Sequence, residues 1–368
     1  MRVLASRMRQ TLGWQRRSTP ERRRGRAGRA QMGAAMKAIV IHEFGNPSVL
    51  NLEDVPEPTL EAGEIAIKVR AATVNQTLDV ALRAGKYARR PPLPHVLGSD
   101  AAGEIAAVGS GVKTLKVGDR VVCHPIIGRQ SNGAPKLLGV DTWGTYAQFV
   151  KVPASTVQIV PDKLDFITAA VVGRHGPLAF TQLRDRAQVK PGEWVLVMGA
   201  AGGLGSALVQ AAKYLGARVI AAAGSEARVA AAIELGADEG INYRSKDLTA
   251  EARRITGGLG VNVVLDNIGD PVTFPKALAA LGFQGRLVTA GGHGGGSVPL
   301  DVKYLYLNVI TIFGNPIDTP DNFRLALQVA AEGKLKVLID KVLPLQEARR
   351  AHEIVEARSG IGKVVLTP

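Results

Sequence analysis

The sequence predicts an α/β protein that combines a β-rich domain with a doubly wound parallel sheet. The chain of 368 residues is long enough for two domains with a core each. Between about residues 36 and 160, short apolar strands alternate with turns that contain Gly and Pro. From about residue 190, buried strands alternate with helices, which is typical of a parallel sheet with helices on both faces.

The composition excludes several other classes of protein. The single cysteine, Cys123, rules out an internal disulfide and a four-cysteine metal site. The sequence contains no apolar, charge-free run long enough to cross a bilayer, so we expect no membrane contact. No apolar segment follows the first basic residues, which argues against a secretory signal and favours a cytoplasmic location.

The net charge of +14 is concentrated at the N-terminus. Residues 1–35 contain ten arginines and one acid, a net charge of +9, which leaves +5 for residues 36–368. The segment 1–35 shows no apolar periodicity, so we expect a disordered tail. Three interpretations stay open: a transit peptide, an arm for nucleic-acid phosphates, or a segment absent from the mature protein. We favour the third, because a strand pattern opens directly at Met36.

The β-rich domain is predicted over residues 36–160. Its expected strands include 37–41, 65–71, 103–108 and the end of 117–122, and its one clear helical pattern is 77–84.

The parallel-sheet domain is predicted over residues 161–314. Its expected strands are 194–198, 218–223, 240–243, 261–266 and 286–290. Its expected helices are 203–215, 226–235 and segments near 249–256 and 271–281. The last segment, 315–368, contains a helix that starts at Thr319-Pro320 and ends at Gly333. Strands at 341–343 and 363–366 flank a further helix near 345–358, and we expect this segment to complete the first domain.

A glycine-rich turn follows the first strand of the parallel sheet. It contains Gly199, Ala201, Gly202, Gly203, Leu204 and Gly205. Glycines at such a junction let the backbone approach a pyrophosphate, and the helix that follows offers free N–H groups. The turn therefore predicts a dinucleotide site, although a tight turn that only packs the helix on the sheet would look similar.

The next strand ends at Gly224 and Ser225, where a site for NAD usually has Asp or Glu. Small residues at the end of this strand, followed by Arg228 and with Tyr243 after the third strand, favour binding of the 2′-phosphate of NADP. Two alternatives stay open: Glu226 could bind a plain ribose, and Arg228 could be an ordinary solvated residue.

From Met36 to the end, the chain resembles the zinc-free quinone oxidoreductases of the medium-chain dehydrogenase/reductase superfamily. The matching motifs are Ala72-Thr73-Val74-Asn75 with Asp79, Arg83-Ala84-Gly85-Lys86-Tyr87, Gly98-Ser99-Asp100-Ala101-Ala102-Gly103, Val117-Gly118-Asp119-Arg120-Val121, Ala200-Ala201-Gly202-Gly203-Leu204-Gly205 and Gly362-Lys363-Val364-Val365-Leu366. The resemblance implies a GroES-like catalytic domain followed by a Rossmann domain that binds NADP, with the active site between them. It also implies a homodimer that pairs through the edge strand 309–314.

The resemblance further predicts that the site lacks zinc. The zinc alcohol dehydrogenases have Cys at the position of Asn75, and His and Glu at those of Ser99 and Asp100. A third ligand lies in the segment that here is 176–180. A catalytic zinc needs three N, S or O ligands, and these positions do not supply a usable set.

Hydride transfer without a metal requires hydrogen-bond donors for the charge that grows on the substrate oxygen. Asn75 is the first candidate donor, to the substrate carbonyl or to the cofactor ribose. Tyr87 is a second donor and a candidate proton source, and Asp79 could orient the network. Each has an alternative: Asn75 could cap a turn, Tyr87 could form a wall, and Asp79 could lie on a helix surface.

The family often has Thr at the position of Leu178, and His175 could replace that contact or cover the cleft. Gly291 and His293 follow the fifth strand, where the resemblance predicts contact with the nicotinamide half, and Lys363 could reach the same region.

We therefore expect an NADPH-dependent enzyme that reduces quinones or α,β-unsaturated carbonyls. An alcohol or aldehyde dehydrogenase is the alternative within enzymes. A nucleic-acid-binding protein that keeps the fold is the alternative from another class, and only the arginine-rich tail points to it, since no RNA-recognition or helix-turn-helix motif is present.

Overall fold

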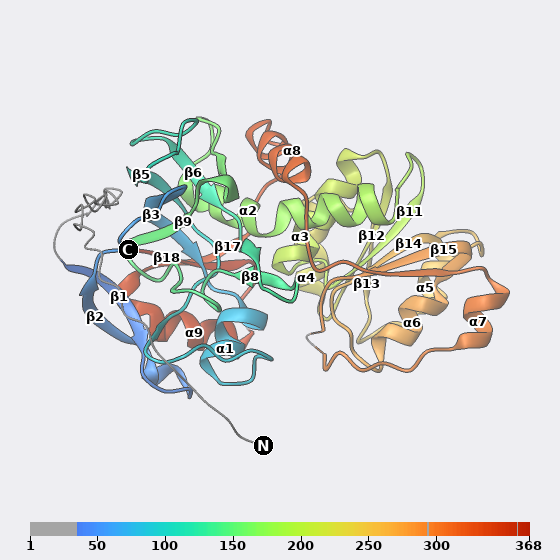
Figure 1. The fold of residues 1–368 in the computed structure, drawn as a ribbon. Helices are drawn as coiled ribbons and strands as arrows, with labels where there is room; N and C mark the ends of the chain where they lie inside the picture. Colours follow the sequence, from blue (N-terminus) through green and yellow to red (C-terminus); the bar gives the residue numbers. More distant parts are fainter. Residues whose placement is uncertain (1–34, 293, 359) are drawn as a thin grey trace, which may run out of the picture.

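The fold comprises a β-rich unit and a parallel-sheet unit that lie side by side (Figure 1). The computed structural model describes residues 35–292, 294–358 and 360–368. The arginine-rich segment 1–34 and His293 therefore lie outside the described residues, and so do the predictions made for them.

The β-rich unit is built around β3, a long strand whose apolar and β-branched residues alternate toward the core. Its main sheet has seven strands in the order β10-β6-β5-β3-β18-β17, with β9 also paired to β3. The strands of this sheet that come from the first part of the chain are β3 (Glu64–Thr73), β5 (Ala102–Val108), β6 (Arg120–Cys123), β9 (Phe149–Pro153) and β10 (Val157–Ile159).

Smaller elements complete this unit. A three-stranded sheet has the order β2-β1-β4, and β7 pairs with β8. These strands are β1 (Ala35–Ile41), β2 (Asn51–Pro56), β4 (His95–Val96), β7 (Ile126–Arg129) and β8 (Pro135–Leu137). The helix predicted over 77–84 lies one residue earlier and consists of the π-turn η2 (Gln76–Val80) followed by α1 (Ala81–Arg83).

The end of the chain returns to the β-rich unit, where β17 (Ile339–Pro344) and β18 (Lys363–Thr367) extend the main sheet. Between them, α9 (Ala348–Ala357) packs on β18. Because β18 pairs antiparallel with β3, with Val365 opposite Thr73, Lys363 lies beside the segment that carries Asn75.

The parallel-sheet unit has six strands in the order β13-β12-β11-β14-β15-β16, all parallel. The strands are β11 (Trp194–Met198), β12 (Arg218–Ala223), β13 (Glu239–Asn242), β14 (Val261–Asp266), β15 (Leu281–Thr289) and β16 (Thr311–Gly314). The strand order reverses between β11 and β14. Such a reversal opens a crevice at the carboxyl ends of the strands, which is where ligands bind in this architecture.

Helices cover both faces of this sheet, as the strand–helix alternation predicts. They are α3 (Gly203–Tyr214), α4 (Glu226–Glu234), α5 (Leu248–Ile255), α6 (Thr273–Ala279) and α7 (Val302–Leu307), and α8 (Pro320–Ala331) packs on α2 (Phe166–Phe180). The predicted α/β class with a parallel sheet is confirmed. No helix among the described residues is long and apolar enough to span a membrane.

The helix α2 joins the two units and was absent from the expected elements. Asp165 caps its N-terminus, and it packs against α3, α8 and the strands β3, β5 and β6. Gly173 allows the close approach to the β-rich unit, since a Cβ there would lie 2.5 Å from Val122 Cγ2. A helix buried on several sides shows no single apolar stripe, so the sequence pattern does not reveal it.

Candidate active site

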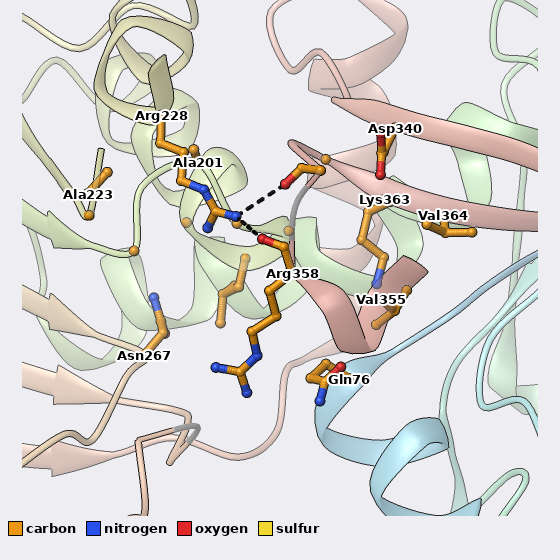
Figure 2. Close-up of a pocket in the computed structure, with 18 of the residues that line it drawn as sticks. Gln76, Ala201, Ala223, Arg228, Asn267, Asp340, Val355, Arg358, Lys363 and Val364 are labelled. Atoms are coloured by element: carbon orange, nitrogen blue, oxygen red, sulfur yellow. Dashed lines mark hydrogen bonds between the residues drawn. The ribbon is translucent and has the colours of Figure 1, made fainter. Parts of the chain in front are cut away.

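A groove with a volume of about 340 Å³ lies between the two units, at the carboxyl edge of the parallel sheet. Most of the predicted cofactor residues line it: Gly199, Ala201, Gly202, Gly203, Leu204, Gly205, Gly224, Arg228, Tyr243 and Lys363. Figure 2 shows Asn267 and Arg228 on the side of the parallel sheet, Gln76 and Lys363 on the side of the β-rich unit, and Arg358 between them.

The glycine turn leaves the N-terminus of α3 open to this groove. Gly199 has a φ of +68°, and a Cβ on Gly205 would lie 2.1 Å from the carbonyl oxygen of Gly199. Gly202 caps α3 without a side-chain hydrogen bond. The first N–H groups of α3 are therefore available to an anion, and the positive end of the helix dipole favours one.

His175 packs directly on this turn. Its Nε2 lies 2.5 Å from the position that a Cβ of Gly203 would occupy, so α2 and the phosphate turn are in contact. The structure therefore places His175 beside the phosphate turn, and both predicted roles, a polar contact in place of the missing Thr and a cover for the cleft, stay predictions.

The groove ends among arginines near Gly224. A Cβ on Gly224 would lie 3.2 Å from both Tyr243 Oη and Arg244 Nε. Arg228 Nη2 donates to the carbonyl oxygens of Arg358 at 2.7 Å and Gly360 at 3.2 Å, as the dashed lines of Figure 2 show. Arg228 is therefore held across the groove and is not a freely solvated residue.

Two other residues at this end have roles within the fold. Ser225 caps α4 by accepting from the N–H of Arg228, and it does not line the groove. Glu226, the alternative ribose ligand, accepts from Asn242 Nδ2 at 2.8 Å. The tip of β12 therefore presents no free acid to the groove within the described residues.

Asn267 lines the groove directly after β14 and was not predicted. It is buried, and neither polar atom of its amide has a hydrogen-bond partner among the described residues. A buried amide without partners is costly, so this residue fits a ligand that supplies both a donor and an acceptor. Its place at the carboxyl end of a parallel strand is the signal that could have revealed it.

On the β-rich side, Asn75 is the centre of a buried polar cluster. Its Nδ2 donates to Asp100 Oδ2 at 2.8 Å and to Asp79 Oδ2 at 3.0 Å, and its Oδ1 accepts from Lys363 Nζ at 2.7 Å. Thr73 donates to Asp100 through its backbone N–H and its hydroxyl, both at 2.8 Å. With both amide protons taken by carboxylates, Asn75 does not fit the predicted role of a donor to the substrate.

Burial shifts the pKa values of two members of this cluster. Desolvation, reinforced by the charge of Asp100, raises the pKa of Asp79 to about 7. Desolvation lowers the pKa of Lys363 to about 8. Asp79 is fully buried and accepts from the backbone N–H and the side-chain amide of Asn75, so it belongs to the cluster and does not lie on a helix surface.

A second cavity, with a volume of about 410 Å³, is lined from both units, by Thr77, Leu78 and Tyr87 of the β-rich unit and by residues 290–292 that follow β15. We call it the substrate cavity. Tyr87, a predicted catalytic residue, lines it, and so does Gly291, which was predicted to contact the cofactor. Leu178, Thr77, Ile126, Ile317 and Arg174 complete part of its wall. The groove and the substrate cavity share the segment 74–78, since Val74 and Gln76 line one and Thr77 and Leu78 the other.

The fold and this site match two family models. Residues 61–162 match the alcohol dehydrogenase GroES-like domain, and residues 203–332 match the family described as zinc-binding dehydrogenase. The human quinone oxidoreductase is 33% identical over 337 residues, which cover 90% of this chain and 97% of that protein. The chain belongs to the medium-chain dehydrogenase/reductase superfamily and is quinone oxidoreductase-like.

Other members of the superfamily carry different names. Quinone oxidoreductase 1 of Escherichia coli is 31% identical, covering 90% of this chain and 99% of that protein. An NAD-dependent alcohol dehydrogenase of Sulfolobus acidocaldarius is 34% identical, with coverage of 90% and 99%. The crystal structure of AibC matches with a TM-score of 0.86 at 34% identity, covering 91% of this chain and 96% of that chain. These relatives confirm a superfamily oxidoreductase with a GroES-like and a Rossmann-type unit.

One matching family is described as zinc-binding, but the residues of this site do not form a zinc site. The described residues contain no group of three His, Cys, Asp or Glu side chains placed to hold a metal ion. Asp79 and Asp100 both accept from the amide of Asn75, and the cations Lys363 and Arg174 lie beside them. A catalytic zinc needs three N, S or O ligands, and this cluster does not supply them.

Proposed function

We propose that this protein is an NADPH-dependent oxidoreductase that transfers a hydride to a quinone or an α,β-unsaturated carbonyl without a metal. One observation carries the proposal: the groove runs from an open helix N-terminus to Lys363 and there adjoins a separate cavity. Such a groove has the place and the donors for a dinucleotide, and the cavity has room for a small substrate.

The preference for NADPH rests on the charges around Gly224. Arg228, Arg244 and Arg358 lie near this end of the groove, where Tyr243 supplies a hydroxyl. Planar guanidinium groups suit a phosphate, which they bind through two parallel hydrogen bonds. Glu226 already accepts from Asn242 and does not line the groove, so the acid next to the tip of β12 is not available to a plain ribose.

When bound, the nicotinamide supplies a hydride. The hydride would come from the C4–H bond of the reduced cofactor, which would become NADP⁺. With an enone, a C–H bond would form at the β-carbon, the C=C pair would shift to the bond between the α-carbon and the carbonyl carbon, and the C=O pair would move to oxygen to give an enolate. A proton would then reach the α-carbon as the carbonyl re-forms. Tyr87 lines the substrate cavity and is the side chain to which we assign that proton. Lys363 and Gln76 line the groove from the β-rich unit, and Asn267 offers its unpartnered amide from the side of the parallel sheet.

We also propose a homodimer that pairs through β16, which lies at the edge of the parallel sheet. Beside this strand, Phe283, Val302 and Tyr306 are each more than half exposed. An open strand edge next to exposed apolar side chains is typical of a subunit interface. A molar mass of two chains in solution, reduced to one by Tyr306→Glu, would support the pairing, and an unchanged mass would oppose it.

An alcohol dehydrogenase is the second candidate, because relatives with that name cover nine-tenths of the chain. Incubation with alcohols and NAD⁺ or NADP⁺, together with the zinc content of the protein, separates the two. Alcohol oxidation that disappears on chelation would favour this candidate over ours.

The test of cofactor choice compares Arg228→Gln with Arg254→Gln, an exposed arginine on α5 that pairs with Glu251 outside the groove. We expect Arg228→Gln to weaken NADPH binding about 10-fold or more, since hydrogen bonds to a charged group contribute roughly 1.5–3 kcal/mol. The affinity of Arg228→Gln for NADH should not change, and neither should the affinities of Arg254→Gln for NADPH and NADH. Fluorescence titrations measure all four, and equal losses for NADPH and NADH would refute the assignment.

A further inference from the structure

Asn75 is fully hydrogen-bonded to its neighbours, so the substrate oxygen lacks the donor expected for it. Its two amide protons point at Asp79 and Asp100, and its oxygen accepts from Lys363, so the orientation of the amide is fixed by its neighbours. Charge that grows on a carbonyl oxygen during hydride transfer must be stabilised by donors already in place. The substrate cavity has to supply them from other residues.

Four ionisable side chains line this cavity within the described residues, beside the neutral hydroxyl of Thr77: Tyr87, Arg89, Arg174 and Asp318. Two of them are already paired. Asp318 Oδ1 lies 2.6 Å from His124 Nε2, and Arg89 Nη1 lies 2.8 Å from Asp141 Oδ2. Their charges are matched inside the protein, which leaves Arg174 and Tyr87 to face a substrate.

Arg174 is held more loosely than Arg89 and Asp318. Its one ion-pair partner among the described residues is Asp100, whose Oδ2 lies 3.7 Å from Nε, too far for a hydrogen bond. That same oxygen already accepts from Asn75 and Thr73. A guanidinium has five N–H donors, so the terminal nitrogens of Arg174 are available to an oxygen in the cavity.

The fold fixes this cation relative to the cofactor groove. Arg174 lies on α2 directly before His175, which packs on Gly203 of the phosphate turn. Its side chain is four-fifths buried, and the neighbouring wall includes Leu178, Ile126 and Ile317. A charge acts more strongly beside such apolar walls than in water, because the local dielectric constant is lower.

We propose that Arg174 binds the carbonyl oxygen of the substrate and stabilises the enolate or quinol oxyanion that forms during hydride transfer. Asn75 is then a positioning residue that holds Asp100 and Lys363 in place. This inference rests on the proposed function. It also specifies the substrate class as conjugated carbonyl compounds, with no requirement for an acidic group on the substrate.

Steady-state kinetics with two matched substrates test the role of Arg174. The substrates are methyl trans-3-benzoylacrylate and the corresponding free acid, which share one enone and differ in charge. We expect Arg174→Met to lower kcat about 100-fold with both, as for loss of an oxyanion donor. Arg174→Lys should recover part of the loss because it keeps the positive charge, and the affinity for NADPH should stay unchanged in both variants.

Two other results of this experiment would overturn the inference. A rise in KM confined to the free acid would make Arg174 an anchor for a carboxylate. Unchanged kinetics with both substrates would show that the oxygen has another donor while the proposed function stands. Absence of turnover by the unaltered protein would instead count against the proposed function.

A second measurement does not require turnover. The probe is 4-nitrophenol, added to the protein saturated with NADP⁺, because its phenolate resembles an enolate oxygen and absorbs at longer wavelength than the phenol. We expect the bound probe to ionise at lower pH than in water, and Arg174→Met to abolish this shift while Arg174→Lys retains it. A bound probe that ionises alike in all three proteins would overturn the inference even if the protein proved inactive.

Discussion

The two sides of the site are built on different physical principles. The cofactor groove is formed largely by backbone: the glycine turn, the uncapped start of α3 and the carboxyl edge of the sheet. The β-rich side is formed by side chains that are far apart in the sequence, with Asn75 bonded to Asp79, Asp100 and Lys363. One side binds through shape and dipoles, and the other through a balance of buried charges.

This difference implies that the two sides fail in different ways. A change in the groove acts through steric fit, so it should weaken cofactor binding before it affects anything else. A change in the cluster leaves a buried charge without its partner, so it should reduce folding stability and depend on pH.

The largest effect is expected for Gly205→Ala. The added Cβ would lie 2.1 Å from the carbonyl oxygen of Gly199, so the backbone of the phosphate turn has to move. Overpacking of this kind costs about 1–3 kcal/mol, which corresponds to a loss of NADPH affinity of up to about 100-fold. Gly314→Ala is the matched control, because a Cβ there meets no atom within 4 Å. Equal affinity in both variants would contradict a groove built on close backbone approach.

A smaller effect, on the other side, is expected for Asn75→Leu. This change removes the donor shared by Asp79 and Asp100 and the acceptor for Lys363, all of them buried. Leaving such groups unpaired should lower the free energy of unfolding by about 2–3 kcal/mol. Urea denaturation measures this loss, with Asn132→Leu in the exposed β7–β8 turn as the control. Equal free energies of unfolding for the two variants would show that the hydrogen bonds of Asn75 do not stabilise the fold.

A third effect is a pH dependence that belongs to Asp79. Its pKa in the folded protein is about 7, against an ordinary value of 3.8, so the folded state binds the proton more tightly than the unfolded state. Stability conferred by this group is therefore present below about pH 4 and is lost as the pH rises toward 7. Relative to the unaltered protein, Asp79→Asn should gain stability progressively across this window.

Asp119→Asn gives the opposite sign and serves as the control. Hydrogen bonds from Lys116 lower the pKa of Asp119, so its contribution is present at higher pH and is lost as the pH falls. Denaturation curves recorded from pH 2 to pH 8 compare the two variants with the unaltered protein, because the contribution of Asp119 changes below about pH 4 and that of Asp79 above it. A flat difference for Asp79→Asn would mean that its carboxyl titrates as in an open chain.

The backbone-built side was the more predictable from sequence. The strand–glycine–helix pattern at 195–205 is local, so it correctly located the turn and the start of α3 at Gly203. The edge position of the strand at 309–314 also agrees with β16, although the strand begins later, at Thr311.

The side-chain-built side was less predictable, because its members meet only through the fold. The resemblance pointed to Asn75, Asp79 and Lys363, but no pattern showed that the amide protons of Asn75 are already taken. Arg174 was missed because α2 is buried on several sides and shows no helical stripe. Arg358 and Arg244 were missed for a simpler reason: an exposed arginine after a helix or a strand has no distinctive pattern.

Deuterium transfer tests most directly the claim that the two sides meet in one reaction. The full chain is mixed with NADPH carrying deuterium at the transferable C4 position and with methyl trans-3-benzoylacrylate, and the product is examined by mass spectrometry and NMR. We predict one deuterium, at the carbon that was β to the ketone, and a proton from solvent at the α-carbon. Tight NADPH binding with no labelled product would contradict the account, because the groove would then bind a cofactor that the substrate cavity does not use.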